Sequence, residues 1–211
     1  MVITYYGLSC FKVSSGEITL AFDPPLKKSS LRSPRFQADI VLLSREHENQ
    51  SGDKMIAEKD DLPLKIKGPG EYEIRGVNIF GIPSYHDESL GKTQGLSTIY
   101  VLELEDLRLC HLGDFGEKNL RAETQEAIGR VDILFLPIGA GSVMNSAKAI
   151  KIANQLEPKI IIPMYYGTKE LDLFLKEAGL ENSKPEEKLT LKKKDPLQDK
   201  TVVRVLKPTI N

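Results

Sequence analysis

Hydrophobic and polar positions along the chain follow the two periods expected of a mixed α/β protein. Short runs of β-branched and apolar residues recur throughout, often alternating with polar residues, and turns rich in Gly, Pro and Ser separate them. Period-two runs bounded by such turns are typical of strands. We expect strands at about 2–6, 9–13, 17–22, 40–43, 64–66, 71–74, 77–82, 98–104, 107–112, 133–137, 160–163, 189–191 and 202–206.

Three segments carry the helical period instead. We expect helices at about 117–129 and 146–156, each followed by a continuous apolar strand. A third helix begins at Thr168, which we interpret as its N-cap, and stops at Gly179. Two successive blocks of strands followed by strand and helix predict two packed sheets with helices outside. The expected fold class is α/β (α+β), a four-layer αββα sandwich built by a single domain over residues 1–211.

Composition narrows the function classes. The 211 residues include 29 Lys and Arg against 30 Asp and Glu, which gives a formal net charge of −1. So small a charge produces no long-range field that would gather phosphates, which argues against general binding of nucleic acid or of anionic membranes. No secretory signal opens the chain, and no stretch reaches the ~20 apolar residues that span a bilayer. Because Cys10 and Cys110 both lie in apolar runs, we expect two reduced, buried thiols and a cytoplasmic protein.

Several polar motifs have plain structural interpretations. The three lysines at 192–194 predict a solvated turn. The Gly-Ala-Gly-Ser segment at 139–142 lacks the Lys-Ser/Thr ending of a phosphate-binding loop, and it predicts a tight loop before a helix. Ser9 and Ser44 have no recognisable His and Asp arrangement for a serine nucleophile. These segments therefore do not define a site.

Five polar loops follow strand-like runs, and loops at strand ends carry function in layered folds. These loops begin near Asp23, Ser44, Ile82, Cys110 and Ile162. The most specific motifs lie in or beside them: Lys-Gly-Pro-Gly-Glu-Tyr-Glu at 67–73, Ile-Pro-Ser-Tyr-His-Asp at 82–87, His-Leu-Gly-Asp at 111–114 and Leu-Glu-Pro-Lys-Ile-Ile-Ile-Pro-Met at 156–164. With these motifs the chain resembles the metallo-β-lactamase superfamily, in its branch of small metal-dependent hydrolases similar to ascorbate-6-phosphate lactonase. The resemblance covers nearly the whole chain.

The resemblance implies which residues stand where the family has metal ligands. After the first buried strand the family reads Thr-His-x-His-x-Asp-His, and here the loop runs from Ser44 to Gln50. His47 keeps one histidine of this motif. Arg45, Asn49 and Gln50 replace the other three ligands.

Outside that loop, two ligand positions are kept and one is changed. His86 falls where the family has a further histidine ligand, and Asp114 falls on the carboxylate that bridges two metals. Tyr165 stands in place of the final histidine of a Pro-Met-His motif. The family's N-terminal Gly-His-Ser is Gly-Leu-Ser at 7–9. We interpret His111 as a structural neighbour of this site.

These replacements matter because a hydrolytic two-metal site requires neutral imidazoles and carboxylates around its ions. Arg45 has no lone pair to offer and carries a fixed positive charge. The amide oxygens of Asn49 and Gln50 are weak ligands for Zn²⁺, and a neutral phenol at Tyr165 is also weak. The second metal position therefore keeps Asp114 alone among strong ligands, and we expect it to be empty.

One hypothesis is a hydrolase with a single remaining metal. His47, His86 and Asp114 would hold one divalent Zn, Mn or Fe ion. Arg45 and Tyr165 would then orient a small ester, lactone or phosphorylated metabolite, which makes Asp114, Arg45 and Tyr165 the candidate catalytic residues.

The alternative is a non-catalytic protein without a cofactor. Arg45 would pair with Asp114 in place of a metal, and the cleft would bind a small molecule or a partner, or the fold would serve in assembly. We favour this ion pair, because a guanidinium inside the cluster repels a bound dication. The family likeness also makes self-association an expectation.

Overall fold

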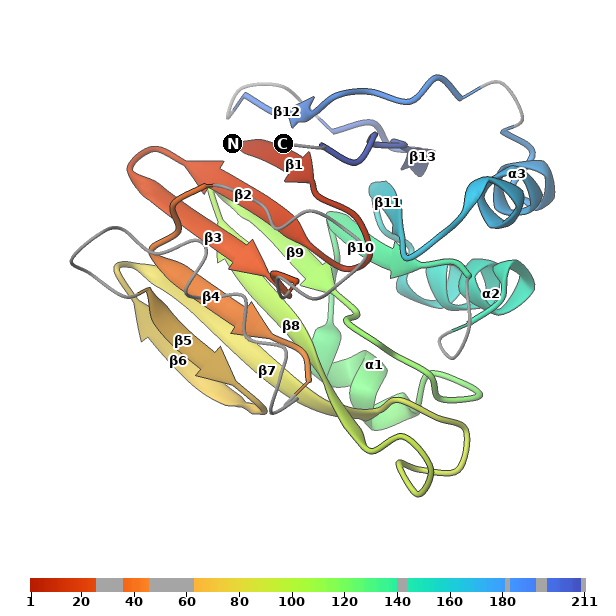
Figure 1. The fold of residues 1–211 in the computed structure, drawn as a ribbon, viewed down its shortest axis with the longest axis horizontal. Helices are drawn as coiled ribbons and strands as arrows, with labels where there is room; N and C mark the ends of the chain where they lie inside the picture. The colour runs from red at the N-terminus through yellow and green to blue at the C-terminus, as the bar shows by residue number, and fades with distance from the viewer. Residues whose placement is uncertain (26–35, 46–62, 140–143, 181–182, 193–196, 210–211) are drawn as a thin grey trace.

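The computed structural model describes residues 1–25, 36–45, 63–139, 144–180, 183–192 and 197–209, and its strands form two mixed sheets packed face to face (Figure 1). The first sheet has the order β12-β1-β2-β3-β4-β5, with bounds Leu189–Thr190, Val2–Tyr5, Phe11–Ser15, Ile18–Phe22, Ile40–Leu43 and Leu64–Lys67. The second sheet has the order β13-β11-β10-β9-β8-β7-β6, with bounds Val202–Val203, Ile160–Met164, Ile133–Pro137, Leu107–His111, Leu96–Leu104, Val77–Tyr85 and Gly70–Ile74.

The main core lies between the two sheets, and alternating side chains of both sheets fill it. Phe11 and Phe22 of the first sheet pack on Phe135 of the second, with ring centroids 4.6 and 5.7 Å apart. Cys10 and Cys110 are both buried and free, as the sequence predicts. The sheets are thus joined mainly by apolar burial, the dominant favourable contribution to folding.

The three described helices cover the outer face of the second sheet (Figure 1). They are α1 (Ala122–Ile128), α2 (Ser146–Leu156) and α3 (Thr168–Glu177). Their apolar residues form a second core with the strands β8, β10 and β11. No helix in the described part of the chain is long and apolar enough to cross a membrane. The predicted α/β sandwich is confirmed.

Two helix starts differ from the expectation. The first helix begins at residue 122 instead of about 117, because the buried Glu117 accepts a hydrogen bond from the Tyr85 backbone and pairs with Arg121. In the third helix the N-cap is Gly167 instead of Thr168, and the Gly167 N–H donates to the carboxylate of Glu170 (3.0 Å). A tertiary contact of Glu117 sets the first boundary, and a local contact of Glu170 sets the second.

A glycine-rich turn carries the chain from one sheet to the other. Strand β5 is the edge of the first sheet, β6 is the edge of the second, and the turn at 68–69 joins them. The Tyr100 hydroxyl accepts from the Gly68 N–H (3.1 Å) and donates to the Leu43 carbonyl (2.8 Å). A Cβ on Gly81 would lie 2.7 Å from the Gly68 carbonyl oxygen. The motif at 67–73 therefore has a structural use.

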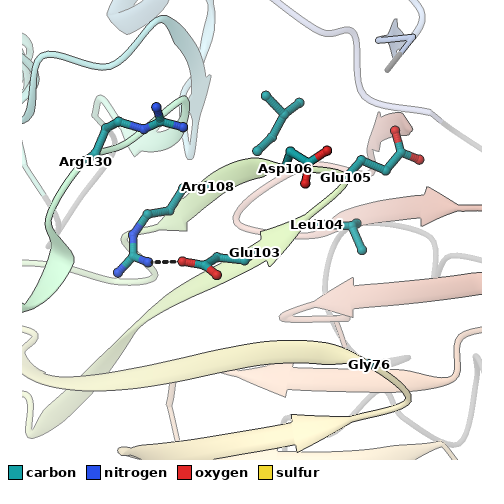
Figure 2. A pocket seen from close by; sticks show the side chains of 8 residues that line it. Gly76, Glu103, Leu104, Glu105, Asp106, Arg108 and Arg130 are labelled. Atoms are coloured by element: carbon teal, nitrogen blue, oxygen red, sulfur yellow. Dashed lines mark hydrogen bonds and ion pairs between the residues drawn. The ribbon is translucent and has the colours of Figure 1, made fainter. Parts of the chain in front are cut away.

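The β8–β9 hairpin turns at Glu105 and Asp106, as predicted, and both residues have positive φ (52° and 64°). A hollow of about 650 Å³ lies beside this turn. Figure 2 shows the side chains that line it, among them Arg108, which pairs with Glu103 (2.5 Å). The turn lies at the end of these strands opposite to Asp114, which follows β9. In the lining of this hollow Glu103 pairs with Arg108, Glu105 with the N-terminal ammonium and Arg130 with Asp132, so these charges make contacts within the protein.

Ser44 joins the two sheets at the end that carries Asp114. Its backbone carbonyl, just after β4, accepts from the Thr98 N–H of β8 (2.8 Å). Gly113 packs so closely against it that an added Cβ would lie 2.5 Å from the Ser44 Cβ. The φ of Gly113 is also positive, at 57°. Only glycine fits this contact between the sheets.

We predict that Gly113→Ala destabilises the protein more than Gly16→Ala. Gly16 has nearly the same φ (56°), but an added Cβ there meets nothing within 4 Å. Both variants carry the backbone cost of positive φ, about 1–2 kcal/mol, and Gly113→Ala adds about 1–3 kcal/mol for overpacking against Ser44. Unfolding by urea measures the difference. Equal losses in the two variants would show that Ser44 does not constrain this contact.

Candidate functional site

The loops singled out in the sequence meet at one end of the sandwich. Arg45 follows β4, His86 follows β7, Asp114 follows β9 and Tyr165 follows β11. Strands β9, β10 and β11 are parallel, and β7 points the same way because it lies antiparallel to β8. Asp23, at the end of β3, joins the group because β3 and β4 are parallel. Four predicted site residues thus share one edge of the molecule.

Arg45 and Asp114 are in contact. The Arg45 Nη1 lies 3.3 Å from Asp114 Oδ2, and Nη2 donates to the Gln94 carbonyl (3.3 Å). The two side chains are only 20% and 14% exposed. A charged pair that is mostly shielded from water interacts more strongly than one on the open surface. The contact that the second hypothesis requires is therefore present, while its role stays a prediction.

Asp23 anchors the residue before Arg45. Its carboxylate accepts hydrogen bonds from the Ser44 N–H and from the Ser44 hydroxyl, both at 2.7 Å. Burial, followed by the charge of Asp114, raises the pKa of Asp23 to about 7, although the hydrogen bonds from Ser44 oppose the shift. Asp23 is thus much harder to ionise than an ordinary carboxyl group.

His86 lies inside the site and is only 3% exposed. Burial lowers its pKa, the charge of Asp114 opposes this change, and the charge of Arg45 adds to it. Its backbone N–H donates to the Gly95 carbonyl (3.1 Å). The imidazole is therefore neutral at physiological pH, and its electrostatic coupling to both Asp114 and Arg45 places it in the same cluster.

Asp87 organises the loop that follows His86. Its carboxylate accepts from the backbone N–H groups of residues 89, 91, 93 and 94, at 2.7 to 3.2 Å. Its hydrogen bond with the Ser89 hydroxyl, and these backbone bonds, lower the pKa of Asp87 to about 2. The loop is therefore wound around one carboxylate, and this fixes the Gln94 carbonyl that contacts Arg45.

His111 is a structural residue, as expected. It is 1% exposed, stacks on Phe22 with centroids 4.6 Å apart, and accepts from the Gly113 N–H at Nδ1 (3.1 Å). Nε2, 3.0 Å from the Ser9 carbonyl, is then the protonated nitrogen. Burial lowers the pKa of His111 to about 4. Both ring nitrogens are engaged within the protein, which leaves none for a ligand.

Tyr165 approaches the cluster on a strained backbone. Its φ is 58°, and its N–H donates to the Leu8 carbonyl (2.9 Å). Burial raises the pKa of Tyr165, the charge of Asp114 adds to the shift, and the charge of Arg45 opposes it. The phenol is therefore neutral. Tyr166 donates to the Leu206 carbonyl (3.1 Å), and both tyrosines pack against the main core.

Comparison with known proteins identifies the family of this chain. Residues 2–165 match a family described as the β-lactamase superfamily domain. The chain belongs to the β-lactamase superfamily. The superfamily that the sequence motifs indicated is thereby confirmed.

Relatives of this β-lactamase superfamily protein extend over most of its length. A UPF0173 metal-dependent hydrolase of Thermococcus onnurineus is 27% identical over 191 residues, 79% of this chain and 84% of the relative. A structure from Thermotoga maritima, assigned to the Zn-dependent hydrolases of the metallo-β-lactamase superfamily, is 29% identical with a TM-score of 0.76. It covers 98% of this chain and 99% of its own. A structure from Parabacteroides distasonis (20% identical, TM-score 0.67, covering 97% and 93%) shares the fold.

The names of these relatives raise the question whether the β-lactamase superfamily site in this chain fits a metal. Within the described residues, no group of three His, Cys, Asp or Glu side chains could hold a metal ion. A guanidinium contacts the carboxylate of Asp114. The described donors by themselves therefore do not fit a metal centre. His47, Asn49 and Gln50 lie outside the described residues, so their predicted roles stay predictions.

Sequence reasoning missed the residues that hold Arg45 in position. Asp87 ends the motif at 82–87, but the motif indicated no role for it, and Gln94 lies outside every motif. Both act through contacts with backbone groups of one loop. One signal was available: an Asp followed two residues later by Ser89 is typical of an Asx turn. Such a turn indicates a wound loop, but it does not indicate which side chain the loop holds.

We predict that Asp23→Asn removes a pH-dependent loss of stability. Because the pKa of Asp23 rises from 3.8 to about 7 on folding, its stabilising contribution is present below pH 3.8 and is lost as the pH rises through 7. Between about pH 4 and pH 8 the stability of the wild type should fall relative to Asp23→Asn by up to about 4 kcal/mol. Denaturant unfolding of both proteins at several pH values measures this difference.

Asp87→Asn is the matched control for this experiment. The pKa of Asp87, about 2, lies below the tested range, so the difference between wild type and Asp87→Asn should stay constant from pH 5 to pH 8. If the Asp23 difference also stayed constant there, Asp23 would not be the titrating group.

Proposed function

We propose that this member of the β-lactamase superfamily is a ligand-binding protein in which Arg45 supplies the positive charge opposite Asp114. The observation that carries the proposal is the 3.3 Å contact between the Arg45 guanidinium and the Asp114 carboxylate. A guanidinium in this place neutralises the carboxylate and supplies N–H groups that can meet an anionic ligand. The site then binds without the chemistry of a metal.

Electrostatics supports this assignment. A dication about 4 Å from the guanidinium would be repelled by on the order of 8 kcal/mol at an effective dielectric constant of 20, before partial solvent exposure reduces the value. Asp114 already balances the charge of Arg45. His86 is neutral, because burial lowers its pKa, and it can offer a hydrogen bond to a ligand as readily as a lone pair to a metal.

The other candidate is the single-metal hydrolase with His47, His86 and Asp114 as ligands. It is favoured by the metal-dependent relatives and by the electrostatic coupling of His86 to Asp114. In that case Arg45 would have to leave Asp114 when the ion binds. The two candidates therefore make different statements about the Arg45–Asp114 contact. The ligand-binding protein keeps this contact when metal is added, and the hydrolase loses it.

We predict that the purified protein carries well under one equivalent of Zn, Mn or Fe and that EDTA leaves its melting temperature unchanged. Elemental analysis and thermal unfolding with and without chelator measure these two quantities. The positive control reverses four replacements together: Arg45→His, Asn49→Asp, Gln50→His and Tyr165→His. We expect the fourfold variant to bind metal and the wild type not to bind it. One tightly held equivalent in the wild type that is lost in His86→Ala would overturn the proposal.

We also predict that the Arg45–Asp114 pair stabilises the protein. Arg45→Met leaves the shielded Asp114 carboxylate without its guanidinium and should cost about 1–3 kcal/mol. The double variant Arg45→Met/Asp114→Asn should recover part of that loss, which a double-mutant cycle in denaturant measures. A coupling energy of zero would show that the pair has no structural role.

A further inference from the structure

The turn between β1 and β2 is tied to the second sheet by two of its carbonyl groups. The Leu8 carbonyl accepts from the N–H of Tyr165, the residue that follows β11 (2.9 Å). The Ser9 carbonyl accepts from Nε2 of His111, the last residue of β9 (3.0 Å). Neighbouring carbonyls of one turn therefore contact the ends of two strands that belong to the other sheet.

A buried phenol supports the first of these contacts. Tyr5, the last residue of β1, is 1% exposed. Its hydroxyl donates to the Leu8 carbonyl (2.9 Å) and accepts from the Tyr165 N–H (3.3 Å). The Tyr5 ring stacks on Phe11, with centroids 4.7 Å apart, so the core fixes the position of the hydroxyl. One hydroxyl thus holds a carbonyl from the first sheet and an N–H from the second.

Both residues that the Tyr5 hydroxyl contacts have a left-handed backbone. The value of φ is 52° at Leu8 and 58° at Tyr165. A side chain strains such a conformation, and the conformation persists only where surrounding contacts determine it. The φ of a residue also sets the direction in which its side chain leaves the chain. The hydrogen bonds of Tyr5 therefore help to fix the direction of the Tyr165 side chain.

The Tyr165 phenol is a hydrogen-bond donor beside the ion pair. The charges of Asp114 and Arg45 both act on its pKa, which places the phenol near them. The residue is half-buried, and its hydroxyl bonds to no other residue in the part of the chain that the structure describes. The hydroxyl of the next residue, Tyr166, instead donates to the Leu206 carbonyl (3.1 Å). Tyr165 can therefore donate to a ligand that approaches the guanidinium.

We infer that Tyr5 is a positioning residue of the binding site: it directs the Tyr165 phenol so that the phenol O–H and the Arg45 guanidinium donate to one oxyanion of a ligand. An oxyanion accepts from both kinds of donor, and hydrogen bonds to an ionised acceptor are strong. The inference rests on the proposed function, because it takes Arg45 rather than a metal as the positive charge. It goes further by naming a second donor and the buried residue that directs it.

Fluorine NMR of the full chain labelled with 3-fluorotyrosine measures the surroundings of the Tyr165 phenol. The chain has seven tyrosines, and the signal that Tyr165→Phe removes belongs to Tyr165. Asp114→Asn should shift this signal, because the charge of Asp114 acts on the phenol. In a Tyr5→Phe background the shift caused by Asp114→Asn should become much smaller. A shift of the same size in both backgrounds would overturn the role of Tyr5.

Tyr166→Phe is the matched control. It also removes a hydrogen bond from a phenol to a backbone carbonyl, but that carbonyl belongs to Leu206 and not to Leu8. The Tyr165 signal should keep its full response to Asp114→Asn in this background. Thermal unfolding of each variant verifies the fold. If Tyr166→Phe reduced the response as much as Tyr5→Phe does, a general loosening of the core would explain the result, and the positioning role would be wrong.

Calorimetric titration with inorganic phosphate at constant ionic strength tests the shared oxyanion. Phosphate should bind the wild type saturably and Tyr165→Phe about tenfold more weakly, the loss expected for one hydrogen bond to a charged group. Tyr5→Phe should also weaken binding, by no more than that factor. Tyr5→Phe/Tyr165→Phe should bind as Tyr165→Phe does, because Tyr5 acts through Tyr165. A further loss in the double variant, or no saturable binding up to roughly 10 mM, contradicts the inference.

Metal analysis of the same preparations separates this inference from the proposed function. If the protein is metal-poor and phosphate binding ignores both Tyr5→Phe and Tyr165→Phe, the inference alone is wrong. If the wild type holds one metal equivalent and EDTA abolishes phosphate binding, the proposed function is wrong. In that case the response of the Tyr165 signal to Tyr5→Phe still decides whether Tyr5 positions the phenol.

Discussion

The site depends on the hydrogen bonds that hold Ser44 between the two sheets. Asp23, from the first sheet, accepts both the N–H and the hydroxyl of Ser44, and Thr98, from the second sheet, donates to the Ser44 carbonyl. Gly113 packs against the same residue with no room for a side chain. Because Arg45 is the next residue, its backbone position is fixed from both sheets, and its side chain then reaches Asp114.

The loop after His86 is a second constraint on the Arg45 guanidinium. It is wound around the Asp87 carboxylate, and it presents the Gln94 carbonyl to Arg45. The guanidinium therefore contacts a carboxylate on one side and a carbonyl on the other. A side chain whose guanidinium is already held by two contacts loses less conformational entropy on binding a ligand than a freely rotating side chain does. This suits Arg45 to a binding role.

The sequence was sufficient for most of the fold and for part of the site. Alternation predicted the strands with one buried face, and continuous apolar runs predicted β4, β10 and β11, which are buried on both faces. The ends of the strands brought Arg45, His86, Asp114 and Tyr165 to one edge. The start of the first helix was predicted wrongly, because a tertiary contact of Glu117 overrides the local pattern.

The charged groups of the site gather around the contact between Arg45 and Asp114. Arg45 and Asp114 neutralise each other at 3.3 Å, burial keeps His86 neutral, and burial with the charge of Asp114 raises the pKa of Asp23 to about 7. A carboxylate beside a bound dication would instead be held in its ionised form, because the ion stabilises negative charge. The protonation of Asp23 is therefore coupled to the occupant of the neighbouring position. A guanidinium that is shared with Asp114 leaves the carboxyl group of Asp23 harder to ionise than usual.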